Sequence, residues 1–362
     1  MHSLLFVLSA LAPVASFGPN PGALAAHEYV PDGLPDNAPL VVVLHGCTQT
    51  APAMAQSAGW NALADAHKFA VLYPEQQTAN NPARCFNWAG EYGDPANMTR
   101  GMGENASILA MVDDQIARHR IDPKRVFVVG LSAGGAFVSV LLATWPERFA
   151  GGSVMAGVPY RCATDVNGAY RCMSPGVAHT AEEWGGYVSA AAPAPSGPRA
   201  RVQIWHGASD TTVAPMNADE LVKQWTHVHG TDATADATDT LGKATRTRYQ
   251  ANGKTAVELY EIAGMGHGIA VGGADCPAKT AAFFVDVGLC STVVAAQFFG
   301  VIPGDPSDPG NPGSPDGGVD PDPDGDGDGD AGNGGCSTSG GAGLARGLAA
   351  VAVLRRRRPT AL

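Results

Sequence analysis

The chain has 362 residues, of which 45% are hydrophobic, and its formal net charge is −11. This composition allows a sizeable buried core, in one large folded domain or two smaller ones. The charge is uneven, since residues 303–335 hold nine Asp and no base, whereas residues 336–362 hold five Arg. The rest of the chain is mildly acidic, which argues against nucleic acid as a partner.

The first sixteen residues, MHSLLFVLSALAPVAS, form an apolar run followed by small residues. This pattern predicts a signal peptide over residues 1–16, although no Lys or Arg precedes the run. The run is too short to cross a membrane as a helix. A buried strand or helix of the folded domain is the alternative interpretation.

Strands and helices are predicted to alternate along the rest of the chain. The first strand, Leu40–Leu44, is a continuous apolar run, as expected for a parallel strand buried on both faces. Further strands are predicted at residues 69–73, 126–129, 152–156, 202–205 and 256–262, and helices at 52–66, 103–119, 215–227 and 277–288. Residues 157–200 look loop-rich. The alternation predicts an α/β fold, a doubly wound and mostly parallel sheet with helices on both faces. Such sheets place functional residues at the carboxyl ends of their strands.

The segment from Arg125 to Val138, RVFVVGLSAGGAFV, combines a buried strand, a tight turn and a helix that begins in small residues. Ser132 stands at the turn, in the sequence Gly-Leu-Ser-Ala-Gly. A G-x-S-x-G turn between a strand and a helix resembles the nucleophile elbow of α/β-hydrolases. The two glycines leave room where a Cβ would meet the neighbouring strand and helix. An ordinary glycine turn is the alternative, which the flanking strand and helix disfavour.

Three predicted strand ends carry the dipeptide His-Gly, beginning at His45, His206 and His267. In α/β-hydrolases the nucleophile comes first along the chain, then the acid, then the base. His45 precedes Ser132 and is therefore excluded as the base. Asp210 lies in the loop after the strand that ends at His206, where the acid belongs, and His267 comes last. We predict a catalytic triad of Ser132, Asp210 and His267, with the other two histidines as structural residues.

Attack by a serine on an ester creates an oxyanion, which requires N–H donors held in place. One donor is predicted to be the backbone N–H of Ala133, directly after the nucleophile. The other is expected in the loop after the first core strand, where we choose Cys47. A Cys47–Cys85 disulfide would then hold this loop in position, in addition to stabilising the fold.

Six of the seven cysteines lie before the acidic segment, and an even number is typical of a secreted disulfide framework. Six cysteines allow fifteen pairings. We favour a bridge across a short loop, a bridge that ties the two ends of the predicted helix 277–288, and the pair that remains. These pairs are Cys162–Cys172, Cys276–Cys290 and Cys47–Cys85. Free buried thiols are the alternative. The sequence has no C-x-x-C and no His/Cys cluster with zinc spacing, so no metal site is predicted.

Several separate motifs occur in order: LVVVLHGCTQT (40–50), YPEQQ (73–77), RCFNW (84–88), RIDPKRVFVVGLSAGGAF (120–137), WHGASD (205–210) and GMGHG (264–268). Together they resemble the extracellular poly(3-hydroxybutyrate) depolymerase family of esterases, to which feruloyl and acetylxylan esterases are related. The resemblance covers about residues 17–300. It implies a secreted α/β-hydrolase domain over residues 17–302 that cleaves esters without a cofactor. It also implies Ser132 as nucleophile, Asp210 as acid, His267 as base and Cys47 as oxyanion donor.

The expected activity is hydrolysis of short-chain polyhydroxyalkanoate, as polymer or oligomer, through an acyl-enzyme. A feruloyl or acetylxylan esterase is the first alternative, and a catalytically silent surface-binding module is the second. Trp88, in the loop after the second core strand, is a candidate wall for a polyester chain. Its alternative is a tryptophan that packs beneath its own loop.

Residues 303–335 are rich in Pro, Gly and Asp, so they predict an extended, disordered linker. The DGDGDGD run lacks the Glu that closes an EF-hand calcium loop. Residues 336–362 contain Cys336, a short apolar stretch and four consecutive arginines, which resembles a MYXO-CTERM sorting tail. This resemblance implies processing near Cys336 by a membrane protease and an extracellular or cell-surface location. A disordered basic tail is the alternative.

Overall fold

The computed structural model describes residues 10–90, 95–193 and 197–304. A ten-stranded sheet lies at its centre, in the order β1-β2-β4-β3-β5-β6-β7-β10-β9-β8. The strands are β1 (Ala12–Pro13), β2 (Ala25–Tyr29), β3 (Leu40–Leu44), β4 (Ala70–Glu75), β5 (Val126–Leu131), β6 (Gly151–Met155), β7 (Arg201–Gly207), β8 (Ala237–Leu241), β9 (Ala244–Ala251) and β10 (Lys254–Ile262). The six central strands, from β4 to β10, are parallel, and antiparallel strands flank them at both edges. The predicted α/β fold with a mostly parallel sheet is confirmed.

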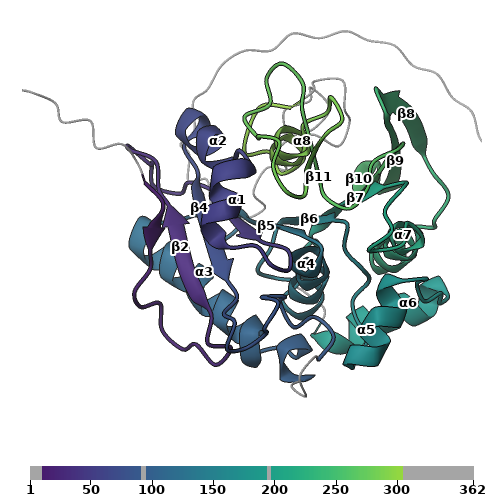
Figure 1. Cartoon of the computed structure of the whole chain (residues 1–362), viewed down its shortest axis with the longest axis horizontal. Helices are drawn as coiled ribbons and strands as arrows, with labels where there is room; N and C mark the ends of the chain where they lie inside the picture. Colours follow the sequence, from purple (N-terminus) through teal and green to yellow (C-terminus); the bar gives the residue numbers. More distant parts are fainter. Residues whose placement is uncertain (1–9, 91–94, 194–196, 305–362) are drawn as a thin grey trace, which may run out of the picture. The chain divides into compact units, whose positions relative to one another are not determined.

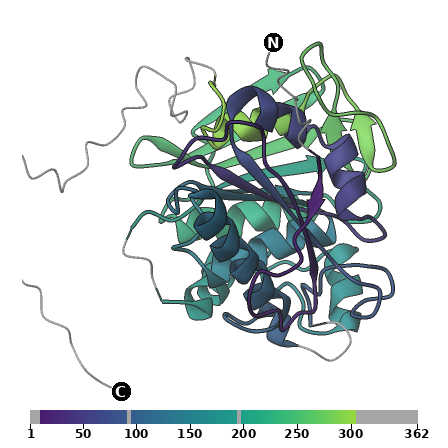
Figure 2. The same ribbon diagram turned by 90° about the vertical axis from the view of Figure 1, so that its left-hand side faces the viewer.

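Helices cover both faces of this sheet (Figure 1). One face carries α1 (Ala51–Ser57), α2 (Trp60–His67) and α8 (Ser291–Phe298). The other carries α3 (Gly103–His119), α4 (Ala133–Thr144), α6 (Ala181–Ala191) and α7 (Met216–Val228), with α5 (Val166–Met173) and the short 3-10 helix η2 (Pro95–Met98) nearby. Figure 2, seen from the edge that β1 and β2 form, shows the two helical layers on opposite sides of the strands.

Alternate side chains of each central strand enter different cores. In β3, Leu40, Val42 and Leu44 pack with α3 and α4, whereas Val41 and Val43 pack with α1, α2 and α8. All five side chains are buried, because successive residues of a strand point to opposite faces and both faces are covered. This double burial explains why the strand reads as an uninterrupted apolar run.

Several predicted elements differ from the observed ones. The predicted helix at 52–66 divides into α1 and α2 at Gly59, whose φ is +80°. The predicted helix at 277–288 is wrong, because this segment contains β12 (Phe284–Asp286), which pairs in parallel with β11 (Ile269–Val271). The segment 157–200 contains two helices, α5 and α6, rather than loops alone. Strands β2, β8 and β9 were not predicted.

The N-terminal residues of the described part join the edge of the sheet. Ala12 and Pro13 pair with Glu28 and His27 of β2. Residues 1–9 lie outside the described residues, so the signal peptide at 1–16 stays a prediction. The segments predicted as linker and sorting tail, 303–335 and 336–362, also lie almost wholly outside them. In the part of the chain that the structure describes, no helix is both long and apolar enough to cross a membrane.

Candidate active site

Ser132 occupies a strained turn between β5 and α4. Its φ is +56° and its ψ is −118°, a backbone conformation that residues with a side chain rarely adopt. Its N–H donates to the carbonyl oxygen of Met155, 2.8 Å away at the end of β6. A Cβ on Gly130 would lie 2.4 Å from the carbonyl oxygen of Gly134, so the chain can turn this tightly only with glycine there. The local geometry is that of a nucleophile elbow.

Strand register brings the three predicted triad residues to one edge of the sheet. Leu131 of β5 lies beside Met155 of β6, which lies beside Trp205 of β7, which lies beside Tyr260 of β10. Ser132 follows this row directly, and Asp210 and His267 lie in the loops that follow β7 and β10. Because all four strands are parallel, these segments leave the sheet at the same carboxyl edge.

Asp210 and His267 form a hydrogen-bonded pair. Nδ1 of His267 lies 2.7 Å from Oδ2 of Asp210, and Oδ1 of Asp210 accepts the N–H groups of Thr212 and Val213 at 2.8 and 2.9 Å. Burial raises the pKa of Asp210, but the bonds from His267 and from the two N–H groups lower that pKa more, so it lies below its usual value. Asp210 is therefore a carboxylate at neutral pH. A proton on Nδ1 leaves Nε2 of His267 unprotonated in the neutral ring, as a base requires.

The other histidine of this region makes different contacts. Nε2 of His206 donates to the carbonyl oxygen of Val213 at 2.8 Å and lies 3.6 Å from Oδ2 of Asp210. Burial lowers the pKa of His206, so its ring is neutral. In the part of the chain that the structure describes, this ring bonds to a backbone oxygen and its buried Nδ1 has no hydrogen-bond partner. Its role as a structural residue stays a prediction.

The loop after β3 lies beside the elbow. A Cβ on Gly134 would lie 2.6 Å from the carbonyl oxygens of Leu44 and His45, so α4 starts directly against this loop. His45 is fully buried, and its Nδ1 donates to the carbonyl oxygen of Gly46 at 2.7 Å while its Nε2 accepts the N–H of Gln76 at 3.1 Å. Burial lowers the pKa of His45, so the ring stays neutral and can act both as donor and as acceptor.

The two N–H groups predicted for the oxyanion hole belong to α4 and to the loop after β3, which lie in direct contact. Ala133 is the first residue of α4, and the first N–H groups of a helix have no partner within the helix. Cys47 lies in the loop after β3, where the neighbouring N–H of Thr48 donates to Ala83 at 2.6 Å. The Cys47–Cys85 disulfide joins this loop to the loop after β4.

A buried carboxylate that the sequence did not suggest holds the loop after β4 in place. Glu104, only 1% exposed, accepts hydrogen bonds from Nε2 of Gln76 at 2.6 Å and from the backbone and side-chain nitrogens of Asn87 at 2.8 and 2.5 Å. The N–H of the same Gln76 donates to His45. These bonds form one network from α3 to the loop that contains Cys47. Each of its residues looks like an ordinary polar residue in the sequence, so no local pattern reveals it.

Trp88 has little exposed surface. Its side chain is 6% exposed and belongs to the core that α3 and α4 line, so its role in substrate binding stays a prediction with little accessible area to support it. All three predicted disulfides are present: Cys47–Cys85, Cys162–Cys172 and Cys276–Cys290.

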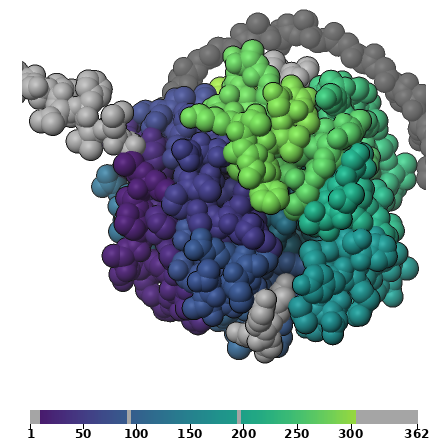
Figure 3. Space-filling model, viewed as in Figure 1, coloured from purple at the N-terminus to yellow at the C-terminus, as the bar shows by residue number. Residues whose placement is uncertain are grey.

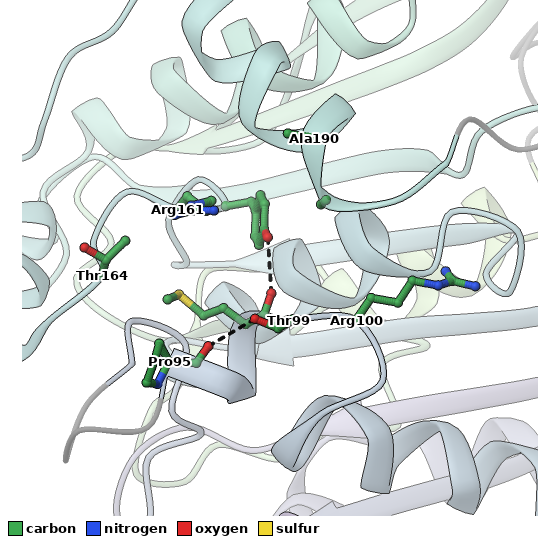
Figure 4. Close-up of a pocket in the computed structure, with 9 residues that line it drawn as sticks. Pro95, Thr99, Arg100, Arg161, Thr164 and Ala190 are labelled. Atoms are coloured by element: carbon green, nitrogen blue, oxygen red, sulfur yellow. Dashed lines mark hydrogen bonds between the residues drawn. The ribbon is translucent and has the colours of Figure 1, made fainter.

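A pocket of about 220 Å³ lies between η2, the loop after β6 and the end of α6 (Figure 4). The hydroxyl of Tyr160 donates to the carbonyl oxygen of Met98 at 3.1 Å across it. None of Ser132, Asp210 and His267 lines this pocket, so it is distinct from the candidate active site.

A strained serine elbow and a hydrogen-bonded Asp–His pair at the carboxyl edge of a parallel sheet define the α/β-hydrolase class. The family model described as "Esterase PHB depolymerase" matches residues 24–252, and the chain belongs to this family. The protein is thus an ester hydrolase of the α/β-hydrolase fold.

Three known proteins illustrate the range of its relatives. The chain is 49% identical to poly(3-hydroxyalkanoate) depolymerase C of Paucimonas lemoignei over 81% of its own length and 70% of that protein. It is 35% identical to feruloyl esterase B of Neurospora crassa over 72% and 88% of the two lengths. The solved acetyl xylan esterase from Aspergillus awamori superposes with a TM-score of 0.69 at 28% identity, over 81% of this chain and 100% of that one.

Proposed function

We propose that this protein is a secreted serine esterase that hydrolyses short-chain polyhydroxyalkanoate, as polymer or oligomer, through an acyl-enzyme intermediate. The main support for this mechanism is the 2.7 Å hydrogen bond between His267 and Asp210. It lies at the sheet edge where Ser132 occupies its strained turn. The extensive identity with a poly(3-hydroxyalkanoate) depolymerase supports the polyester substrate.

In the proposed mechanism, Oγ of Ser132 attacks the ester carbonyl carbon while Nε2 of His267 accepts the hydroxyl proton. The oxyanion that forms accepts hydrogen bonds from the N–H groups of Cys47 and Ala133. When the intermediate collapses, His267 gives its proton to the leaving alcohol and the acyl group stays on Ser132. Water then attacks the acyl-enzyme with His267 again as base, which releases the acid and restores the serine. Asp210 stabilises the imidazolium in both halves of the reaction.

Hydrolysis of p-nitrophenyl butyrate by the purified protein tests the proposed chemistry. We expect turnover that Ser132→Ala abolishes, while Ser153→Ala, which removes a hydroxyl buried in β6, leaves kcat within a few fold. A wild-type protein without measurable hydrolysis would instead support the catalytically silent binding module.

A plant cell-wall ester is the second candidate substrate, because feruloyl and acetylxylan esterases are among the relatives. Clearing of a poly(3-hydroxybutyrate) film and release of ferulate or acetate from arabinoxylan distinguish the two. Ferulate or acetate release without film clearing or oligomer hydrolysis would contradict the polyester assignment.

We propose that residues 1–16 are a signal peptide, 17–302 the catalytic domain, 303–335 a linker and 336–362 a sorting tail that directs the enzyme to the cell surface or exterior. Three disulfides support export, since such bonds form in oxidising compartments. Processing near Cys336 predicts that secreted protein lacks the residues after it. Intact mass spectrometry that finds Arg355–Leu362 in the mature protein would contradict the sorting tail.

A further inference from the structure

Phe283 is an exposed aromatic residue beside the catalytic histidine. Its side chain is 41% exposed, whereas the adjacent Phe284 is 2% exposed. Its ring lies at 82° to the ring of His267, with 6.3 Å between their centroids. The ring of Phe283 is therefore partly in water when no substrate is present, whereas the adjacent ring of Phe284 belongs to the core.

The backbone holds this ring in an unfavourable conformation. Phe283 has φ of +65°, which is rare for a bulky residue and which Gly, Asn or Asp would adopt more readily. Its carbonyl oxygen accepts the N–H of Ile269 at 2.8 Å, and a Cβ on Gly268 would lie 2.6 Å from the same oxygen. The segments that contain Phe283 and His267 are therefore in direct backbone contact. Strain that persists beside a reacting group is typical of a functional residue.

Neighbouring structure fixes the segment that carries Phe283. The Cys276–Cys290 disulfide closes the loop around it, and the N–H of Lys279 donates to the carbonyl oxygen of Ser57 at the end of α1 at 2.8 Å. The segment lies on the surface of the molecule, in light green in the space-filling view (Figure 3). A binding residue on such a braced segment loses little freedom when the substrate arrives.

The chemistry of the base decides which part of the substrate meets this ring. His267 must protonate the departing alcohol oxygen, so the alcohol side of the ester lies next to His267, while the acyl carbonyl faces the N–H donors of the oxyanion hole. Building on the proposed function, we infer that Phe283 is a specificity-determining residue that binds the alkyl group on the alcohol side of the ester. In a 3-hydroxyalkanoate polyester, this group is the carbon chain next to the ester oxygen.

The test varies the alcohol and the acyl group separately. Titration of released acid gives kcat/KM for methyl butyrate, butyl butyrate and methyl acetate with wild type, Phe283→Leu and Phe283→Asn. We expect Phe283→Asn to reduce the preference for butyl over methyl butyrate about tenfold. This is the factor expected when apolar contact with one or two carbons is lost. Phe283→Leu should keep part of that preference. The preference for butyrate over acetate should stay within twofold, because the acyl side does not meet the ring.

Stability gives a second readout. Asn suits the left-handed backbone at this position, so Phe283→Asn should leave the Tm unchanged or raise it. Tyr170→Asn is the control, since it removes a 66% exposed ring from α5, and it should not change the preference for the alcohol.

Four results would overturn the inference. All esters slowing by the same factor in Phe283→Asn would mean that the ring acts only through His267. Unchanged kcat/KM values for all esters in Phe283→Asn would mean that Phe283 does not contact the alcohol group, and an equal effect of Tyr170→Asn would mean that the effect is not specific to Phe283. A wild-type protein that releases no acid from any of the esters would overturn the proposed function itself, and the inference with it.

Discussion

The two oxygens of Asp210 have separate tasks. Oδ1 accepts the N–H groups of Thr212 and Val213, and Oδ2 accepts the Nδ1 proton of His267. This division explains why the residue is a carboxylate rather than an amide, since each oxygen faces donors only.

Asp210→Asn is therefore expected to reduce kcat about 10³–10⁴-fold. The single oxygen of Asn would keep the two backbone bonds, so its NH₂ group would face His267. That contact favours a proton on Nε2 of His267, and the ring can no longer accept the proton of Ser132.

The measurement is the kcat for p-nitrophenyl butyrate, together with far-UV circular dichroism to verify folding. Asp36→Asn, at an exposed carboxylate paired with Arg120, is the control and should retain full activity. A folded Asp210→Asn protein with more than a tenth of the wild-type kcat would contradict the assigned acid.

At the residue scale, Asp210 and His267 are predicted from two features together: the fixed order of nucleophile, acid and base in the α/β-hydrolase triad, and their positions in loops that follow predicted strands. Phe283 was missed for a physical reason. The pair Phe283-Phe284 looks like two core residues, and only the backbone conformation places one ring outside and the other inside. Burial and backbone strain at single positions depend on tertiary contacts that a local pattern does not contain.

At the scale of elements, α4 and the loop after β3 are built as one unit. Every residue of α4 is buried, and the helix begins against the backbone of Leu44 and His45. The elbow, the N–H of Ala133 and the loop that contains Cys47 therefore cannot move independently.

Gly134→Ala should disturb all of them together. The added Cβ would lie 2.6 Å from two carbonyl oxygens, so the helix or the loop must shift. We expect the free energy of unfolding to fall by about 1–3 kcal/mol and kcat by about 10²-fold, because small displacements at a reacting centre have large effects.

Denaturant unfolding and the kcat for p-nitrophenyl butyrate measure the two effects. Gly186→Ala is the matched control, because Gly186 is an exposed glycine of α6 whose Cβ would meet nothing within 4 Å. It should stabilise the protein by about 0.5–1 kcal/mol without changing kcat. Gly134→Ala with wild-type kcat would show that the unit tolerates displacement.

The elements that sequence patterns predicted well are strands with a continuous apolar run and helices with one apolar face. Strands β3, β5, β7 and β10 and helices α3 and α7 agree with the predicted ranges to within a few residues. The wrong helix at 277–288 has a tertiary cause. Its Ala and Lys residues favour a helix, but pairing with β11, the Cys276–Cys290 bridge and the contact of Ala278 with Gly59 favour an extended path.

For the described molecule as a whole, the disulfides are confined to the segments that follow the central strands. Cys47–Cys85 joins the loops after β3 and β4, Cys162–Cys172 lies after β6, and Cys276–Cys290 lies after β10. All of these segments leave the sheet at its carboxyl edge, so the covalent bonds stabilise the site-forming loops, whereas the sheet itself relies on its two cores.

The two bridges nearest the start of the chain should thus differ in their effect on kcat when both cysteines of a pair are replaced by Ser. Cys47–Cys85 spans 38 residues and Cys162–Cys172 spans 10, so loop-closure entropy predicts losses of about 4 and about 3 kcal/mol in the free energy of unfolding. The stability effects are similar, but only the first bridge holds the loop with the proposed oxyanion donor.

Loss of one such donor typically reduces turnover about 10²–10³-fold. We therefore expect Cys47→Ser/Cys85→Ser to lose about 10²-fold in kcat under conditions where it is folded, and Cys162→Ser/Cys172→Ser to lose less than fivefold. Equal losses of kcat in the two folded double variants would show that the first bridge stabilises the fold without positioning the oxyanion hole.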